Sequence, residues 1–293
     1  MVHKLVRQYK NFKHRIFSLY KKSLEQAFLT VFIGINLLPK GRLITSSGLE
    51  KIWNKTYEHR IGARKLLFHT PNWLTEYRAR TLLTKEPETI SWINRIPLNS
   101  VFFDVGANIG VYSVYAASIK NAQVIAFEPS FLNLELLYRN IQSNHLENKI
   151  TIIPLSLSNA NQIENLYMEK KDNIWGGAHN SSGLNTTQDG RPMEEFTVSS
   201  QVAISLDSLS ELLGLPVPAY IKIDVDGLES IILAGAQKNL INVKEILIEV
   251  DKRNVSQIAD VKGILNTLGF VQEKYIGTIE LEENQIWVKK GDL

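Results

Sequence analysis

The sequence contains no cysteine. This absence excludes a disulfide framework, a thiolate metal site and a cysteine nucleophile, and it is typical of reducing compartments. Long apolar runs are also missing: the longest, residues 27–38, carries polar residues and is too short to span a bilayer. No small-residue cleavage site follows the basic N-terminus, so we expect no secretory signal. We therefore expect a cytoplasmic protein, either soluble or peripheral at the membrane.

Basic residues are concentrated in the first third of the chain. Residues 1–100 hold 18 Lys and Arg against 6 Asp and Glu, a net charge of +12, whereas residues 101–293 carry −9. Residues 2–22 hold seven basic side chains and no acid, with apolar residues every three or four positions. This pattern predicts an amphipathic helix with a basic face. It fits peripheral membrane contact through residues 2–22, docking on the chain's own domain, or a homo-oligomer.

From residue 101 onward, short apolar segments alternate with segments of helical period, which indicates βαβ units and a mostly parallel sheet. The predicted strands are Val101–Val105, Ala122–Phe127, Ile150–Pro154, Ala219–Val225, Lys244–Val250, Phe270–Tyr275 and Gln285–Lys289. The helices predicted between them are Val111–Ser118, Leu132–Asn144, Leu228–Asn239 and Ser256–Leu268.

The chain divides into two parts by composition. We expect residues 1–84 to form a basic, mainly helical extension and residues 85–293 to form an α/β domain with helices on both faces of its sheet. Residues 170–200 interrupt the alternation with Gly, Asn, Ser and Thr. Because so long a loop in a compact domain is usually functional or mobile, we interpret it as a substrate lid. His179 within it is a candidate general base, since histidine titrates near neutral pH.

A glycine-containing turn joins the first predicted strand to its helix. Gly106 and Gly110 let the backbone turn tightly and approach a ligand. Glu128 ends the next strand, where Rossmann folds place the carboxylate that binds two ribose hydroxyls. Asp104 precedes the turn, and Asn108 replaces its middle glycine. An acid there repels the pyrophosphate of a dinucleotide, whereas S-adenosylmethionine has no phosphate and carries two cationic groups, so the turn favours S-adenosylmethionine.

Carboxylates follow the fourth and fifth predicted strands. Asp224 and Asp226 end the fourth, Glu229 lies just beyond, and Glu249 ends the fifth. Because ligands of open α/β sheets bind outside the carboxyl ends of the strands, Asp224 and Glu249 should face one crevice. There a carboxylate can act as general base toward a hydroxyl, or Asp224 and Glu249 can hold Mg²⁺. Alternatively, Asp226 caps the next helix, with Glu229 completing the cap. We expect Lys222 to face solvent or to lie behind these carboxylates.

Three motifs together resemble the FkbM family of methyltransferases, within a similarity over about residues 85–250. They are Phe103-Asp-Val-Gly-Ala-Asn-Ile-Gly110, Phe127-Glu-Pro129 and Ile221-Lys-Ile-Asp-Val-Asp-Gly-Leu-Glu229. The chain departs from the family pattern at Asp226 and Leu228, where a glutamate and an alanine are more usual. The resemblance implies a Rossmann-like class I fold with seven strands, one of them antiparallel. It also implies S-adenosylmethionine as methyl donor and a hydroxyl acceptor on a sugar, glycan, glycolipid or natural product.

The same resemblance implies which residues hold the cofactor. It assigns the methionine end to Asp104, Gly106, Asn108 and Gly110 with Ala107 beside them, the ribose to Glu128 with Pro129 beside it, and the adenine edge to Leu157 and Ser158.

Two other functions explain part of the sequence. Asp224-Val-Asp226 has the spacing that many metal-dependent nucleotide-sugar glycosyltransferases use, but this reading leaves the glycine turn and Glu128 unexplained. The second alternative is a non-catalytic membrane-docking module anchored by residues 2–22. The acidic side chains of Asp224 and Glu249, which such a module does not need, argue against it. We expect no nucleic-acid partner, because no Asn-Pro-Pro-aromatic motif follows the fourth strand.

Overall fold

The computed structural model describes residues 22–178 and 180–291. The chain forms two compact units, Met1–Lys55 and Thr56–Leu293. In the first unit, the described residues form a helix over 22–36 and helix α2 (Gly41–Trp53). The amphipathic helix expected over residues 2–22 lies, up to residue 21, outside the described residues. No helix in the described ranges combines the length and apolar character that a bilayer span requires.

A seven-stranded sheet forms the centre of the second unit, in the order β12-β15-β11-β10-β3-β4-β5. Only β15 runs antiparallel to its neighbours, which confirms the mostly parallel sheet with one antiparallel strand. Each predicted strand of this sheet is present, with ends that differ by a few residues. The strands are β3 (Val101–Val105), β4 (Gln123–Phe127), β5 (Ile150–Ile153), β10 (Tyr220–Ile223), β11 (Glu245–Glu249), β12 (Phe270–Gln272) and β15 (Asn284–Lys289).

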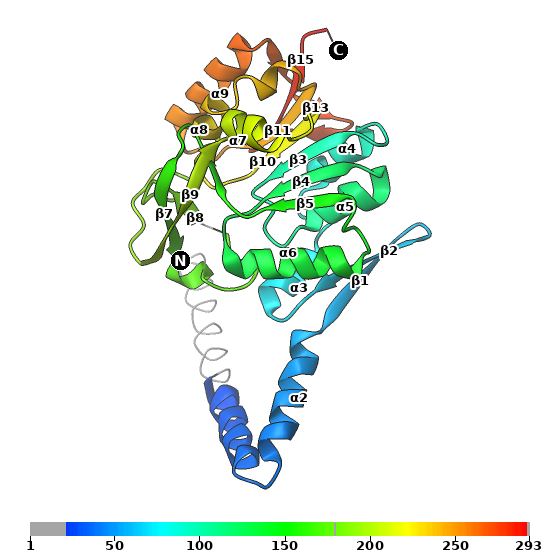
Figure 1. Ribbon diagram of the computed structural model, residues 1–293, viewed down its shortest axis with the longest axis vertical. Helices are drawn as coiled ribbons and strands as arrows, with labels where there is room; N and C mark the ends of the chain where they lie inside the picture. Colours follow the sequence, from blue (N-terminus) through cyan, green and yellow to red (C-terminus); the bar gives the residue numbers. More distant parts are fainter. Residues whose placement is uncertain (1–21, 179, 292–293) are drawn as a thin grey trace, which may run out of the picture. The chain divides into compact units, whose positions relative to one another are not determined.

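Helices cover both faces of this sheet (Figure 1). Because side chains alternate along a strand, neighbouring Phe102 and Phe103 enter separate cores on opposite faces. Helices α4 (Pro87–Arg95), α5 (Val111–Lys120) and α6 (Phe131–Ser143) pack against the core of Phe102. Helices α7 (Leu206–Leu213), α8 (Glu229–Ala234) and α9 (Val255–Thr267) pack against the core of Phe103. The predicted α/β architecture is therefore confirmed.

Helix α8 is shorter than the predicted Leu228–Asn239, since it ends at Ala234. The reason is a close approach of the chain at Gly235, where a Cβ atom would lie 2.1 Å from the carbonyl oxygen of Ser158. The chain continues from there through turns into the short 3₁₀ helix η2 (Asn239–Ile241).

Residues 56–84 belong to the second unit and pack against its helices and strands. They form the antiparallel hairpin β1 (Thr56–Ile61) and β2 (Arg64–His69), followed by α3 (Trp73–Arg80). Asn144 at the end of α6 bonds both the N–H and the C=O of Leu67. We expected a mainly helical extension through residue 84, but the division between units falls at 55/56 because this hairpin joins the α/β unit.

A second, four-stranded sheet has the order β6-β9-β7-β8. Its strands are β6 (Ser156–Ser158), β7 (Gln162–Glu169), β8 (Asn180–Ser182) and β9 (Phe196–Ser205). Parts of the expected loop 170–200 therefore belong to strands or to the 3₁₀ helix η1 (Lys170–Asp172). Strands β7 and β9 form through backbone pairing of distant segments, from Glu169 with Phe196 to Gln162 with Ala203, and no local sequence pattern predicts this pairing. A short hairpin of β13 (Tyr275–Ile276) and β14 (Ile279–Glu280) precedes β15.

Candidate active site

A cavity of about 290 Å³ opens at the carboxyl ends of β3, β4, β10 and β11. This is the edge where ligands of open α/β sheets bind. Both the predicted cofactor-binding residues and the predicted catalytic residues contribute to the lining of this cavity. The predicted residues that line the cavity are Gly106, Asn108, Glu128, Pro129, Leu157, Asp224, Asp226 and Glu249. The structure therefore brings the expected cofactor and catalytic groups into one space.

Glu128 lies at the wall of this cavity with its carboxylate almost fully buried. The backbone N–H groups of Asn108 and Ser130 donate to its two oxygens, at 2.7 and 2.8 Å. Burial raises the pKa of Glu128 to about 7, although these backbone donors lower it in part. Each carboxylate oxygen can accept more than one hydrogen bond, so a vicinal diol of a ribose can still be bound there.

Gly106 keeps β3 close to β10. Its φ is +81°, and a Cβ atom would lie 1.9 Å from the carbonyl oxygen of Asp224. A side chain at residue 106 would push apart the two strand ends that frame the cavity. Gly110, at φ +80°, serves helix packing instead, because its Cβ would meet Leu137 of α6 at 2.3 Å.

Several predicted residues lie behind the cavity wall. Those outside the lining are Asp104, Ala107, Gly110, Ser158 and Glu229. Asp104 is buried, accepts a hydrogen bond from Ser113 at 2.6 Å, and is paired with Lys222 in the β3–β10 register. Ser158 donates to Glu164 at 3.1 Å. His179 lies outside the described residues.

Half-buried Asp224 and Glu249 and buried Lys222 form a group of ionisable side chains at the ends of β10 and β11. The ammonium of Lys222 lies 2.6 Å from Oδ2 of Asp224. Burial raises the pKa of Asp224, but Lys222 and a hydrogen bond with Glu249 lower it more, so the net shift is downward. The negative charge of Asp224, together with burial, raises the pKa of Glu249. At neutral pH we therefore assign an ionised Asp224 and a protonated Glu249.

Lys222 is fully buried, which contradicts the expectation that it faces solvent and agrees with a place behind the carboxylates. Burial lowers its pKa, but Asp224 and Asp104 raise it more, so it stays charged. Its ammonium also lies over the ring of Tyr112, 5.2 Å from the centroid. Lys222 thus fixes the charge on Asp224.

Asp226 and Glu229 do not form the helix cap considered above. Helix α8 begins at Glu229, and Leu228 before it makes no side-chain cap bond. Asp226 instead adopts a left-handed φ of +56°, which is unusual for a residue other than glycine, and it lines the cavity. Glu229 is fully buried and accepts the N–H groups of Val225 and Gly227. It therefore holds the backbone of the loop in which Asp226 lies.

The structure gives no support to the expected Mg²⁺ site. Within the described ranges, no group of three or more His, Asp or Glu residues is arranged to hold a metal ion. The donor chemistry agrees, because Lys222 already compensates the charge of Asp224.

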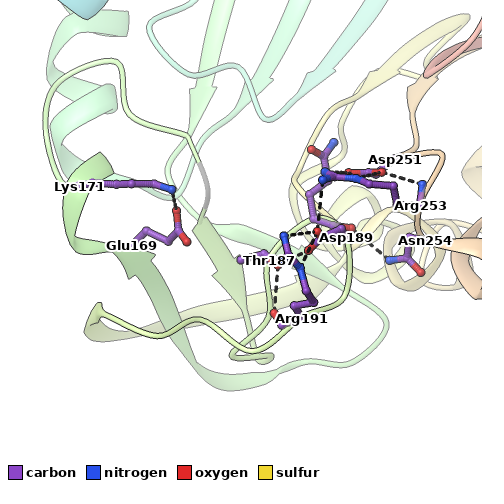
Figure 2. Close-up of polar contacts among 9 residues, drawn as sticks. Glu169, Lys171, Thr187, Asp189, Arg191, Asp251, Arg253 and Asn254 are labelled. Atoms are coloured by element: carbon purple, nitrogen blue, oxygen red, sulfur yellow. Dashed lines mark hydrogen bonds and ion pairs between the residues drawn. The ribbon is translucent and has the colours of Figure 1, made fainter. Parts of the chain in front are cut away.

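Two anchors hold the segment 170–200 next to the cavity. At the first, Asn108 and Asn133 both donate to the carbonyl of Gly177, at 2.8 and 3.0 Å, and Arg78 donates to Gly176. The second is the cluster around Asp189 in Figure 2, where Arg191 and Arg253 both contact its carboxylate.

At this second anchor, Asn254 donates to the carbonyl of Gln188, and Gln188 lines the cavity. Arg253 follows β11 in the chain and also pairs with Asp251 (Figure 2). The residues around Gln188 are thereby fixed to the segment that follows β11. That residues 170–200 act as a substrate lid remains a prediction, and the contacts that hold this segment beside the cavity are now defined.

The cavity also contains residues that the sequence did not single out. Tyr77 and Arg78 come from α3, and Lys85 precedes α4. Arg78 lowers the pKa of Glu128, and Lys85 lowers that of Asp224. A single basic residue among the many in residues 1–100 carries no local signal of a site. Tyr77 and Arg78 reach the cavity because α3 packs on the β1–β2 hairpin and at Gly176.

The fold is the Rossmann-like α/β fold of S-adenosylmethionine-dependent methyltransferases, with the carboxylate pattern of such a site at its expected edge. Residues 104–274 match the model of the methyltransferase FkbM domain. The chain therefore belongs to the FkbM methyltransferase family. The glycosyltransferase alternative is not supported, since this domain includes both Asp224 and Asp226.

Comparison with individual proteins shows distant relatives. The methyltransferase sdnD of Sordaria araneosa is 26% identical over 170 residues, covering 50% of this chain and 64% of that protein. The chain thus spans less than two thirds of that relative's length. Precorrin-6y C5,15-methyltransferase from Geobacter metallireducens has 13% identity and a TM-score of 0.39, over 71% of this chain and 89% of that one. TrmK of M. capricolum, solved with S-adenosyl-homocysteine, has 10% identity and a TM-score of 0.41, over 70% and 68%.

Proposed function

We propose that this protein transfers a methyl group from S-adenosylmethionine to a hydroxyl group on a sugar, glycan, glycolipid or natural product. The carrying observation is that Glu128, at the end of β4, and the pair Asp224 and Glu249, at the ends of β10 and β11, line one cavity. The carboxylate of Glu128 is suited to bind a ribose diol, and that of Asp224 is suited to bind the reacting hydroxyl.

The residues present fit this cofactor. Glu128 offers two acceptor oxygens to the ribose, and Gly106 leaves the backbone bare beside it. Phe127, Leu155 and Leu157 give apolar walls for a flat base. Asp226 places negative charge where the cationic methionine end would lie. When bound, S-adenosylmethionine supplies an electrophilic methyl group on a sulfonium.

The chain's own part is to bind the acceptor hydroxyl and receive its proton. Asp224 is the ionised member of the pair, so its carboxylate accepts the hydrogen bond of the hydroxyl. It takes the proton as the oxygen–methyl bond forms and the sulfur–methyl bond of the donor breaks, leaving the thioether S-adenosylhomocysteine. Lys222 keeps Asp224 charged before the reaction. Protonated Glu249 donates to Asp224 and so orients it. Positioning accounts for much of the rate, because no covalent intermediate with the enzyme is needed.

Binding of S-adenosylhomocysteine tests the cofactor assignment first. Calorimetric titration of the full chain should show tight binding, whereas NAD and a nucleotide-sugar should not bind. Glu128→Ala should abolish the binding without unfolding the protein, as judged by circular dichroism. Equal affinity of the Glu128 variant would refute the ribose assignment.

Substitution of the carboxylate pair tests the chemistry. Asp224→Asn should lower kcat about 10²- to 10⁴-fold, the range for loss of a general base, and Glu249→Gln should lower it less. Both variants should bind S-adenosylhomocysteine as the wild type does. Full turnover in Asp224→Asn would assign the proton to another group.

A further inference from the structure

A second cavity of about 350 Å³ lies beside the first. Lys85 and Glu249 line both cavities, so the two spaces share these side chains as a common wall. We call the second one the acidic pocket. Its lining consists of Lys85, Glu86, Glu88, Glu249, Glu280, Glu282, Glu283 and Asn284.

The acidic pocket carries an excess of negative groups, with five glutamates besides the protonated Glu249 against one lysine. Lys85 pairs with Glu86. Lys252 approaches Glu282 and Glu283 at 3.5 and 3.7 Å, but it is largely exposed, and exposed pairs of this kind are weak. The charge of the pocket is therefore only partly compensated by the protein.

Asn284 supplies an independent indication of a ligand. Its side chain is buried, with 7% exposure, and its amide oxygen has no hydrogen-bond donor. Its amide nitrogen is already used, since it donates to Glu88 at 2.7 Å. A buried acceptor without a donor costs about 1–3 kcal/mol. A group with N–H donors and a positive charge would satisfy both Asn284 and the glutamates around it.

The ligand chemistry is that of an organic cation. In the parts of the chain that the structure describes, no His, Asp and Glu cluster has the arrangement of a metal site. A protonated amine offers up to three donors and needs no fixed coordination geometry.

We propose that the acidic pocket binds a protonated amine of the methyl acceptor, so that the substrate class is an amine-bearing hydroxyl compound such as an amino sugar. This inference rests on the proposed function, because the adjoining cavity must hold the reacting hydroxyl at Asp224.

Binding of matched sugars tests the proposal. With the full chain saturated by S-adenosylhomocysteine, we expect glucosamine and glucosamine-containing disaccharides to bind at least tenfold tighter than their N-acetyl counterparts. Glu88→Gln and Glu280→Gln should each reduce this preference severalfold. Glu147→Gln, an exposed glutamate that lines neither cavity, should leave it unchanged.

The outcomes separate this proposal from the proposed function. Equal affinity for amine and N-acetyl forms, no binding of any amine, or a preference that survives both pocket variants would overturn the amine site. Failure of S-adenosylhomocysteine to bind, with an intact amine preference, would instead overturn the methyltransferase assignment and leave the pocket standing.

A different observation concerns the first unit. Its described part exposes eleven large apolar side chains, each between 50% and 81% accessible. They are Leu24, Phe28, Leu29, Val31, Ile33, Leu37, Leu38, Leu43, Ile44, Leu49 and Ile52. So many exposed large apolar side chains in one short segment mark a docking surface.

The pattern of apolar and basic residues in this part of the chain favours lipid as the occupant. At about 100° per residue, Phe28 and Val31 lie on one side of the helix over 22–36 and Leu29 adjoins them, so these side chains form a broad apolar face of the kind that lies in a membrane interface. The uncharged run 27–38 has the length of an interfacial or re-entrant segment. Residues 22–55 carry five basic and two acidic side chains, which complements anionic headgroups.

We infer that residues 22–55 insert shallowly into an anionic membrane surface. The full chain should float with vesicles containing 30% phosphatidylglycerol and bind pure phosphatidylcholine vesicles at least tenfold more weakly. The double variant Leu43→Asn and Ile44→Asn should reduce flotation at least tenfold. Leu212→Asn, at an exposed leucine of α7, should not. Absence of flotation, or apolar residues protected instead by a dimer that the double variant dissociates, would overturn the lipid assignment.

Discussion

At the scale of single residues, the buried state of Glu128 has a direct consequence for ligand binding. Its pKa is raised to about 7 by burial, and only the ionised carboxylate accepts both ribose hydroxyls. The affinity for S-adenosylhomocysteine should therefore be full above pH 8 and fall as the pH drops through 7. At pH 6 the loss should be roughly tenfold, since one pH unit below a pKa leaves about a tenth of the group ionised.

Calorimetry at pH 6, 7 and 8 measures this dependence. In Glu128→Gln the affinity should be weak and nearly constant over the same range, because the titrating group has been removed. A dissociation constant that is the same at pH 6 and pH 8 in the wild type would contradict the assignment.

Gly106 allows a second prediction at this scale. Gly106→Ala places a Cβ within 1.9 Å of a backbone oxygen and forces alanine to a φ of +81°. We expect a loss of more than about 2 kcal/mol in unfolding free energy, measured by urea denaturation. The matched control is Gly263→Ala in α9, where nothing lies within 4 Å of the new Cβ, so the stability should be unchanged or rise by about 0.5–1 kcal/mol. Equal effects of the two substitutions would exclude the close approach of β3 and β10.

At the scale of elements, the segment from β8 to β9 depends on its anchors. Asp189 contacts Arg191 and Arg253. Hydrogen bonds from Arg191 and Thr187 hold the pKa of the Asp189 carboxyl well below its usual range. Arg253→Ala breaks the connection to the segment after β11, and we expect amide hydrogen exchange of residues 186–192 to rise about tenfold. The affinity for S-adenosylhomocysteine should stay within twofold.

Lys171→Ala gives the matched control for this prediction. Lys171 pairs with Glu169 elsewhere in the same connecting region and does not contact Asp189 (Figure 2). Its removal should leave exchange at residues 186–192 as in the wild type. Unchanged exchange in Arg253→Ala would show that the rest of the loop, and not the ion pairs, holds this segment in place.

At the scale of the whole molecule, two buried glutamates make stability depend on pH. Burial raises the pKa values of Glu128 and Glu229 to about 7, whereas the same groups titrate near 4.5 when exposed. Between these values the folded protein binds more protons than the unfolded chain. Their contribution to the unfolding free energy therefore falls as the pH rises from 4.5 to 7. Each group accounts for about 3 kcal/mol over that window.

Glu229→Gln isolates one of these contributions. The amide cannot ionise, so relative to the wild type the variant should gain about 3 kcal/mol between pH 4.5 and pH 8. Other titrating groups cancel in this difference. Urea denaturation of both proteins at several pH values measures it, and a difference that does not change with pH would show that Glu229 titrates normally.

The sequence by itself determined the sheet and the edge at which the site lies. The alternation of apolar strands and amphipathic helices from Val101 onward is local, so it could be read without coordinates. Residues at strand ends, such as Glu128, Asp224 and Glu249, were placed by the rule that carboxyl ends of parallel strands share one edge.

Only the tertiary structure decided which charges are paired and which residues from outside the motifs join them. Lys222 is buried because β10 lies in the middle of the sheet, and Arg78 reaches the cavity because α3 packs on the β1–β2 hairpin and at Gly176. The second sheet forms through pairing between distant segments, which local sequence does not encode. The β1–β2 hairpin, by contrast, is closed by the two-residue loop Gly62-Ala63 and is a local feature that the sequence analysis missed. The protonation states are likewise decided by the tertiary structure, because the pKa of a carboxyl group depends on its burial and on neighbours that are distant in the chain.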